Sequence, residues 1–490
     1  MTADFTLILR HGGLPSRGPS ASDYLETMAA QVIEVCLPFL SLMRRFESEG
    51  HAYRFCLECP PQLFEALQNK ELEEMVRGCL EQHIHRLRAD LSQQSEPLLR
   101  AIHQEDLAQF EESLTTMTQL QSGLLGEYRR LMSAGYVEPI VGPMTDIALT
   151  AHLADPGVVK AQLLGAVDAV SKIFGQAPAG VLLTESGYTP SMNDLLSETS
   201  VRYVVVDQQA FDGASAPLQS GPYAPLHSPG GGLALFAKQR NFSRWRSSRE
   251  TPHADAYRRL SVDGESTWDT STLAAQASVY CPQIARAVAY VHADDFVNSR
   301  LQECQTVTRR LTRAPHLLGC LDVGLRAQNW REVLFFLEGV VRSVAKSDGL
   351  NWITPGQYLD LYKTNQACWT GSAYASRTLT SLGLSRAPAL HDAAHRLDVL
   401  VRVKQELSVA ERETVDAALR ELLWAQAVAS DESSISENTQ RYQKHLDTLY
   451  GLITPVEAAL PDELRNREEM PVARPKPKRP DPHFGPLTIT

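Results

Sequence analysis

Two acidic residues stand where predicted strands end, and together they could do glycosidic chemistry. Glu185 closes the apolar run GVLLTE, and Asp322 closes the run HLLGCLD. In a parallel barrel, strand ends of this kind face the site. Two carboxyl groups about 5 Å apart can cleave or transfer a glycosidic bond with retention, one as nucleophile and the other as acid and then base. The pattern alone favours a plainer interpretation, in which each carboxylate caps a helix or pairs with an arginine.

The elements that must position these residues follow from the hydrophobic pattern. Short apolar runs rich in β-branched residues alternate with segments of helical period, which predicts an α/β protein with parallel strands and crossover helices. Strands are expected from Phe5, at Tyr53–Leu57, Val137–Val141, Val181–Leu183 and Val201–Asp207, and up to Asp322. Helices are expected from Asp23 with a kink at Pro38, from Pro60-Pro61, from Asp155-Pro156 to Gly175, at 191–199, and at about 294–310.

The same pattern predicts three parts along the chain. Residues 1–365 are expected to form the barrel domain, including a helical insertion at about 62–130 that is too long for a simple crossover. Residues 366–462 carry mostly helical patterns and are expected to form a helical C-terminal domain. Residues 463–490 are Pro-rich and basic without apolar periodicity, which predicts a disordered tail.

Composition narrows the class of protein. The 490-residue chain has a net charge of -11, which disfavours nonspecific nucleic-acid binding and is compatible with a neutral polysaccharide. No apolar run approaches the length of a membrane span, and the N-terminus shows no secretory signal, so we expect a cytoplasmic protein without a membrane partner. The eight scattered cysteines are expected as reduced thiols, and the Cys56–Cys59 pair as a coincidence at a strand end.

Longer segments around the two acids carry a family resemblance. The run GVLLTESGYTPSMNDLLSETSVRYVVVD resembles the motif of glycoside hydrolase family 57 in which a strand ends in the nucleophilic glutamate, and Glu185 matches that residue. The run RAPHLLGCLDVGLRAQNWREV is similar to the segment ending in the acid/base aspartate, with Asp322 at that place. Trp330 and Glu332 match residues downstream of it without a gap.

Further motifs occur in the family's order. In LILRHGGLP, His11 fits the first histidine of the first motif, and YVEPIVGPMTD resembles the second motif through Glu138 and Thr145. HADDFVNSRL matches a helix of the same family. The segment ELLWAQAVASDE, near Trp424, continues the resemblance in the manner of the branching-enzyme subgroup.

The resemblance implies a fold, a substrate and a site. It implies an incomplete (β/α)7 barrel with helical additions, no metal or cofactor, and α-1,4-glucan (glycogen, amylose or maltooligosaccharide) as substrate. The catalytic pair is Glu185 as nucleophile and Asp322 as acid/base. Arg240 either lies near the sugar or anchors its loop. The sequence gives no prediction of the oligomeric state. The residues expected to bind substrate are His11, Asp146, Tyr188, Arg240 and Trp330.

Departures from the family pattern leave the function open. They remove side chains that would bond to or stack on sugar, although Trp245, Trp268 and Trp369 lie in long loops and could replace lost platforms. The leading hypothesis is a retaining α-glucan enzyme of branching type. The alternatives are an inactive homologue that binds glucan or a protein partner, and a metal-dependent polysaccharide deacetylase. Gly13 and Asp146 stand where the family has histidines, and Thr184 stands where it has proline. Leu321 replaces an aromatic residue, and Gly324 replaces an acidic one.

Overall fold

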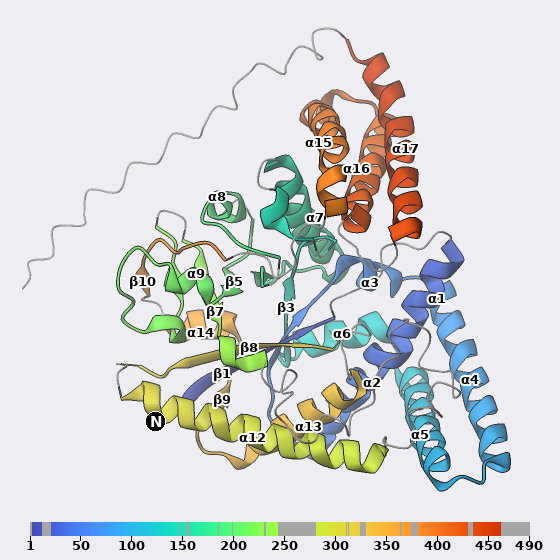
Figure 1. The fold of residues 1–490 in the computed structure, drawn as a ribbon, viewed down its shortest axis with the longest axis vertical. Helices are drawn as coiled ribbons and strands as arrows, with labels where there is room; N and C mark the ends of the chain where they lie inside the picture. The colour runs from blue at the N-terminus through green and yellow to red at the C-terminus, as the bar shows by residue number, and fades with distance from the viewer. Residues whose placement is uncertain are drawn as a thin grey trace, which may run out of the picture.

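The computed structural model shows a curled sheet of mostly parallel strands with helices packed around it and a helical region at the C-terminal end (Figure 1). The residues it describes are 2–11, 21–145, 147–152, 156–184, 186–197, 199–229, 232–243, 281–309, 311, 313–323, 330–362, 365–373, 381–429 and 435–461. This architecture confirms the predicted α/β class and the incomplete (β/α)7-type barrel.

One sheet contains all ten strands of the described residues, in the order β10-β6-β7-β5-β4-β3-β2-β1-β8, with β9 also paired to β1. Every pairing is parallel except that of β6 with β7. The strands are β1 (Ala3–Arg10), β2 (Phe55–Glu58), β3 (Val137–Val141), β4 (Gly180–Leu182), β5 (Tyr203–Asp207), β6 (Leu226–His227), β7 (Ala234–Lys238), β8 (His316–Asp322), β9 (Leu350–Trp352) and β10 (Gln366–Ala367).

A single side chain bridges the open seam between β7 and β8. Gln239, which directly follows β7, donates from its backbone N–H to the Leu318 carbonyl at 3.1 Å. Its side-chain oxygen accepts from the Leu318 N–H, and its Nε2 donates to the His316 carbonyl at 3.2 Å. Because a buried amide takes the place of strand-to-strand bonds, β8 is held beside β7 although the two strands form no ladder.

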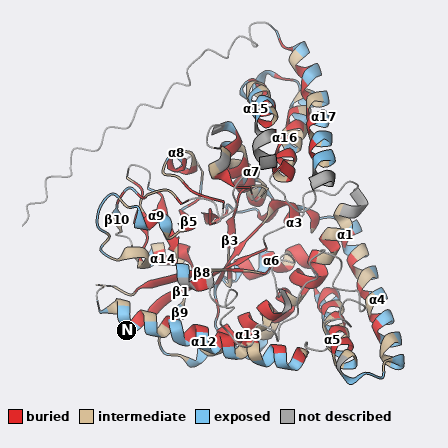
Figure 2. Cartoon of the chain, in the orientation of Figure 1, coloured by how far each residue is buried: buried red, intermediate tan, exposed pale blue. Residues whose placement is uncertain are grey.

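The inside of the curled sheet has its own apolar core. Side chains alternate along each strand, so every second residue points inward and the others face the helices. The inward set forms a cluster separate from the large core between the sheet and the helices. Figure 2 shows that the strands are mostly buried. Its members are Ile8, Cys56, Ile140, Leu182, Tyr203, Val205, Ala234, Phe236, Leu318, Ile353 and Tyr358.

The first helical stretch is bent and largely buried. It consists of α1 (Ala21–Gln31), a π-helical segment η1 (Val32–Cys36) and α2 (Leu37–Glu49), with Pro38 in the first turn of α2, where the kink is predicted. By length and composition the stretch Tyr24–Glu49 qualifies as a membrane span, which corrects the expectation that none exists. Of its most apolar window, 72% is buried inside the protein, as in a core helix.

Between β2 and β3 the chain is helical, as predicted. The helices are α3 (Pro61–Ala66), α4 (Lys70–Gln93), α5 (Pro97–Gln119) and α6 (Gly123–Ser133). Helices α4 and α5 lie side by side at one margin of the molecule (Figure 1). Their helical character is confirmed, while their assignment as an insertion within a first domain stays a prediction.

The remaining helices of the barrel lie between its later strands in the sequence or follow them. They are α7 (Pro156–Phe174), α8 (Met192–Ser197), α9 (Gln209–Asp212), α12 (Pro282–Thr308), α13 (Trp330–Lys346) and α14 (Pro355–Leu361). The predicted start of α12 near Asp294 is wrong, because the helix begins at Pro282, which suits a first-turn position after the extended residue Cys281.

Three long helices form the C-terminal region, which lies beside α7 in Figure 1. They are α15 (Ser381–Arg402), α16 (Val409–Ala429) and α17 (Ile435–Ala459). They share a hydrophobic cluster that also includes Val158 of α7. The predicted helical character is confirmed, the domain boundaries stay a prediction, and the expected tail at 463–490 lies outside the described residues.

Candidate active site

A chain of three charges runs along the edge where β2, β1 and β8 end. Arg10 closes β1 and stands in register with Glu58 of β2 on one side and with Asp322 of β8 on the other. Its Nε lies 3.2 Å from Glu58 Oε2, and its Nη1 lies 3.5 Å from Asp322 Oδ1. The predicted acid/base residue is therefore at the end of its strand, with a guanidinium beside it.

The three side chains differ in exposure. Arg10 and Glu58 keep 4% and 7% of their side-chain surface, whereas Asp322 keeps 30%. A buried charge is stable only when it is paired, so Arg10 and Glu58 depend on each other. Gly142, after β3, makes room for this pair, because a Cβ there would collide with Glu58 Oε1. The arrangement sets a buried guanidinium beside Asp322, whose side chain stays partly exposed.

Two further strands bring charges to the same edge. Lys238 of β7 and Asp207 of β5 are register partners, and their Nζ and Oδ1 atoms are 3.0 Å apart. Burial raises the pKa of the nearby Cys320 thiol to about 12, and the charges of Lys238, Arg10, Asp207 and Asp322 act on it more weakly. Two ion pairs therefore stand at these strand ends, Lys238 with Asp207 and Arg10 with Asp322, and the partly exposed Cys320 lies near both.

The predicted nucleophile itself lies outside the described residues, as does Asp146. The chain can be followed to Thr184, which is buried, and Leu183 donates its N–H to the Val205 carbonyl at 2.8 Å. Because β4 is parallel to its neighbours, its C-terminal end lies at the edge of the sheet where Asp322 stands. The pairing of the two acids stays a prediction.

Tyr188 occupies a different place from the one expected of a substrate contact. It is fully buried, and its hydroxyl lies 2.9 Å from Asn193 Oδ1 and 3.2 Å from Thr370 Oγ1. Its backbone forms a two-bond bridge with Ala373. In this arrangement Tyr188 fastens the segment that follows Glu185 and has no surface left for a ligand.

His11 also departs from its expected place. It is fully buried among the rings of Phe39, Phe64 and Tyr128, whose centroids lie 6.2 to 6.3 Å from its own. Alternation along β1 turns Arg10 inward and His11 outward, toward the helices. Burial lowers the pKa of His11 to about 4, so the imidazole is neutral. This placement corrects the expectation that His11 binds substrate from the barrel mouth.

Arg240 is exposed and anchors a loop. It opens the 3-10 turn η4 (Arg240–Ser243), and its Nη2 lies 2.5 Å from Asp212 Oδ2 at the end of α9. This contact agrees with the anchoring alternative. Trp330 is the first residue of α13, and its side chain lies outside the described residues.

The family-like helix motif on α12 holds this loop against β8. Phe242 of η4 packs on Gly319, where a Cβ would overlap its ring, and on Phe5, with ring centroids 6.0 Å apart. The Arg300 guanidinium lies 5.0 Å from the centre of the Phe242 ring, and Phe296 meets that ring edge-on. These residues therefore position the chain beside Asp322, three residues along β8 from Gly319.

The second motif lies at the other end of the barrel. Glu138 of β3 accepts hydrogen bonds from the Tyr203 hydroxyl at 2.6 Å, the Thr354 hydroxyl at 2.7 Å and the Gly356 N–H at 3.2 Å. It thus joins β5 and the start of α14 at the N-terminal ends of the strands. Its role there is to hold the fold.

The C-terminal region reaches the loop after β3. Gln162 of α7 bonds through its side chain to the N–H of Thr145 at 3.0 Å and to the Oε1 of Gln426 at 2.8 Å. Gln426 belongs to α16, in the segment whose resemblance to branching enzymes is noted above. Thus α16 supports the loop that leads to Asp146.

Sequence reasoning missed Arg10 and Glu58. Both are charged residues that end apolar strands, TLILR and FCLE, and this was the available signal. What was lacking was the register that brings them to Asp322.

A parallel barrel with a partly exposed carboxylate at the C-terminal ends of its strands is the architecture of a barrel enzyme. The glycosyl hydrolase family 57 model matches residues 42–270. The structure resembles the α-amylase AmyC from Thermotoga maritima, with 21% identity, a TM-score of 0.81 and coverage of 95% of each chain.

Two further structures are similar. A GH57 branching enzyme from Thermococcus kodakaraensis has 18% identity and a TM-score of 0.78, covering 96% of this chain and 95% of that one. A GH57-type branching enzyme from Pyrococcus horikoshii has 18% identity and a TM-score of 0.74, covering 92% and 88%. The family model covers just under half of the chain, and at these identities the structural likeness shows the shared fold.

Proposed function

We propose that the protein is a retaining α-glucan-active enzyme, and among such activities we favour 1,4-α-glucan branching over other amylolytic reactions. The observation that carries the proposal is the placement of Asp322, which is partly exposed at the end of β8 and held by the buried Arg10. The neighbouring structures named as an α-amylase and as branching enzymes support the substrate class.

The proposed reaction has two steps, and both acids take part in each. Glu185 attacks the anomeric carbon while Asp322 gives its proton to the leaving glycosidic oxygen, which forms a glycosyl-enzyme intermediate. Asp322, now a carboxylate, takes the proton of an incoming glucan hydroxyl or of water, and that oxygen displaces Glu185. A glucan hydroxyl as acceptor makes a branch, whereas water makes a reducing end.

Trp369 supplies a stacking surface for this substrate. It is 50% exposed, in a segment that is tied to the chain after Glu185 through the contact of Thr370 with Tyr188. Its carbonyl also accepts from the N–H of Ser215 at 2.9 Å. An aromatic face held in this way suits a neutral sugar ring. Trp245 and Trp268, the other predicted platforms, lie outside the described residues.

A second candidate function is a family 57 homologue without catalysis that binds glucan or a protein partner. It is favoured by the burial of His11 and Tyr188, two of the predicted sugar contacts. For either function we propose a cytoplasmic protein that needs no metal or cofactor. The eight cysteines, all free thiols in the structure, agree with that location.

The experiment compares the wild type with Glu185→Gln on amylose. Products are debranched for chain-length analysis, and reducing ends are assayed in parallel. Asp168→Asn, a change of the same kind on the exposed surface of α7, serves as the control. New branch points made by the wild type and the control, and absent with Glu185→Gln, support the branching proposal. New reducing ends alone support hydrolysis, and glucan binding without product supports the second candidate.

A further inference from the structure

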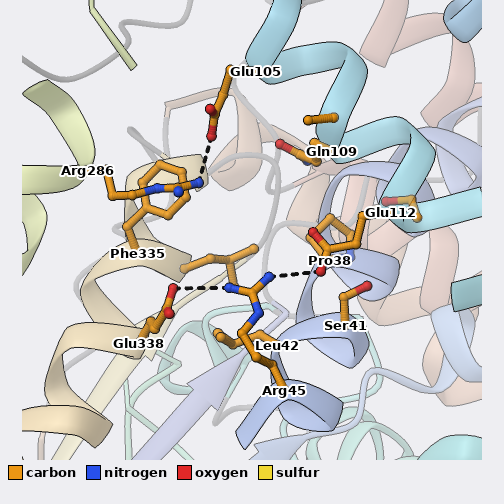
Figure 3. Close-up of a pocket in the computed structure, with 13 residues that line it drawn as sticks. Pro38, Ser41, Leu42, Arg45, Glu105, Gln109, Glu112, Arg286, Phe335 and Glu338 are labelled. Atoms are coloured by element: carbon orange, nitrogen blue, oxygen red, sulfur yellow. Dashed lines mark hydrogen bonds and ion pairs between the residues drawn. The ribbon is translucent and has the colours of Figure 1, made fainter. Parts of the chain in front are cut away.

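A pocket of about 210 Å³ lies apart from the strand ends, among α2, α5, α12 and α13. All its lining residues come from helices, and none is a residue of the charged edge around Asp322. Helix α5, which belongs to the long helical segment between β2 and β3, closes it against the barrel helices (Figure 3).

Two arginine–glutamate pairs frame the pocket. Arg286 of α12 donates from Nη2 to Glu105 Oε1 at 2.7 Å. Arg45 of α2 donates from Nη2 to Glu112 Oε1 at 2.8 Å and reaches Glu338 Oε2 of α13 only at 3.5 Å. Figure 3 shows both guanidinium groups beside the open space, with the carboxylates around them.

The balance of charge selects the kind of ligand. The three carboxylates of the lining are matched by Arg45, Arg286 and Arg342, which pairs with Glu338 from outside the pocket at 2.9 Å, so neither an anion nor a cation is favoured. A guanidinium carries five N–H donors and a carboxylate about four acceptor positions, so these pairs still offer both donors and acceptors. Gln109 adds one group of each kind. A neutral ligand rich in hydroxyls uses both, because each hydroxyl donates and accepts.

The remaining wall is flat and apolar. This wall consists of Leu42, Pro38 and Leu334, next to Phe335, whose ring is covered by the Arg286 guanidinium at 4.5 Å from its centre. A sugar ring presents C–H groups on its faces and hydroxyls at its rim, which matches an apolar wall bordered by charged side chains. The side chains of Arg45 and Arg286 are 38% and 45% exposed, so the pocket is open to solvent.

We propose that this pocket is a second carbohydrate-binding site, which takes a sugar unit of a neutral glucan chain away from the barrel mouth. The choice of an α-glucan rests on the proposed function. Such a site would hold a long chain on the outer helices while another part of the chain reacts.

Local hydrogen–deuterium exchange with maltoheptaose tests the proposal. The full-length Glu185→Gln protein is used, so that the ligand is not consumed. Ala108 of α5 lines the pocket between Glu105 and Glu112, and Ala108→Trp should fill it. Ala89→Trp places the same side chain at an exposed position on α4 outside the pocket and serves as the matched control. Circular dichroism and thermal unfolding confirm that each variant is folded.

The expected result is slower exchange in residues 105–113. At a ligand concentration ten times the dissociation constant, the slowing is about tenfold. It persists with Ala89→Trp and is lost with Ala108→Trp. If Ala108→Trp does not fold, Gln109→Leu, which removes donor and acceptor together, should weaken the slowing.

Other outcomes would overturn the pocket proposal, and they can be told apart from a failure of the proposed enzyme activity. If wild-type protein turns over amylose but exchange at 105–113 is unchanged by maltoheptaose, the pocket proposal fails and the enzyme assignment stands. Slowing by inorganic phosphate and not by maltoheptaose would mark an anion site instead. Slowing by maltoheptaose in a protein without turnover supports the pocket and defeats the branching activity alone.

Discussion

The two ends of the barrel strands carry acidic residues with opposite environments. At the N-terminal end, Glu138 accepts three hydrogen bonds from Tyr203, Thr354 and Gly356. A Cβ on Gly356 would collide with its carboxylate, so the start of α14 packs directly against this side chain. At the C-terminal end, Asp322 has Arg10 on one side and keeps 30% of its side-chain surface.

The difference separates stability from chemistry within one set of strands. A carboxylate whose oxygens are all engaged contributes to the fold, whereas one that is oriented and still open can exchange a proton with a substrate. A place in a family-like motif therefore does not reveal what an acidic residue does, since Glu138 and Asp322 both fall in such motifs. Four variants or conditions test the contrast, from the largest expected effect to the smallest.

Replacing Asp322 by Asn should have the largest effect. Removal of the acid/base group lowers kcat on amylose by about 10²- to 10⁴-fold. The amide keeps the size of the side chain and its site is partly exposed, so the free energy of unfolding changes by less than about 1 kcal/mol. Steady-state kinetics and urea denaturation measure the two quantities. Unchanged kcat would remove Asp322 from the mechanism.

Replacing Glu138 by Ala should show the reverse. Three donors lose their common acceptor at a partly buried place, which lowers the free energy of unfolding by about 2 kcal/mol. Activity per folded molecule stays at the wild-type level. Urea denaturation of Glu138→Ala beside Glu138→Gln, which keeps one acceptor, measures the effect. A loss of kcat with normal stability would contradict the division between the two ends.

Mild acid should weaken the protein through two buried histidines. Burial lowers the pKa of His11 to about 4, and burial with the charge of Arg313 lowers that of His316 to about 3. Both stay neutral when folded and gain protons when unfolded, so stability is lost as pH falls below about 6.5. The slope is about 1.4 kcal/mol per pH unit for each histidine.

Denaturation midpoints between pH 7 and pH 5 measure this slope. His316→Gln preserves a hydrogen-bond partner for the Thr6 hydroxyl. It should reduce the dependence of stability on pH by the contribution of one histidine, about 1.4 kcal/mol per pH unit. A slope equal to that of the wild type would mean that His316 is not neutral in the folded protein.

Replacing Arg240 by Ala should have the smallest effect. Its ion pair with Asp212 is exposed, and such pairs contribute less than about 1 kcal/mol. If Arg240 only anchors its loop, Arg240→Ala, Asp212→Ala and the double variant all show the same small loss of stability and an unchanged KM. A higher KM for Arg240→Ala alone would indicate contact with the sugar.

Much of the fold could be predicted from the sequence because its strands and helices have clear periods. The strands that end at Val141, Asp207 and Asp322 were expected at these places. The strands β6, β7, β9 and β10 were not predicted. Three of them have two or three residues, too few to show alternation, and β7 lies in a short run between a Gly- and Pro-rich loop and a polar stretch. The start of α12 was misplaced because Ile284 and Val291 are exposed apolar residues, which blur the helical stripe.

The site was predictable in position and less so in detail. A strand-end acid such as Asp322 is visible from local pattern. The inward or outward direction of a neighbour is not, and His11 therefore seemed a ligand contact although Arg10 holds the inward place. Tyr188 likewise follows a motif, but its burial depends on Asn193 and Thr370.

The sequence by itself determined the α/β class, the helical segments and the strand ends that carry the acids, because local periodicity and short motifs encode them. Only the tertiary structure decided which charges meet. Arg10 reaches Asp322, and Gln239 closes the seam beside β8, through pairings between segments far apart along the chain. Register and burial set these contacts, and both depend on how all the strands pack together.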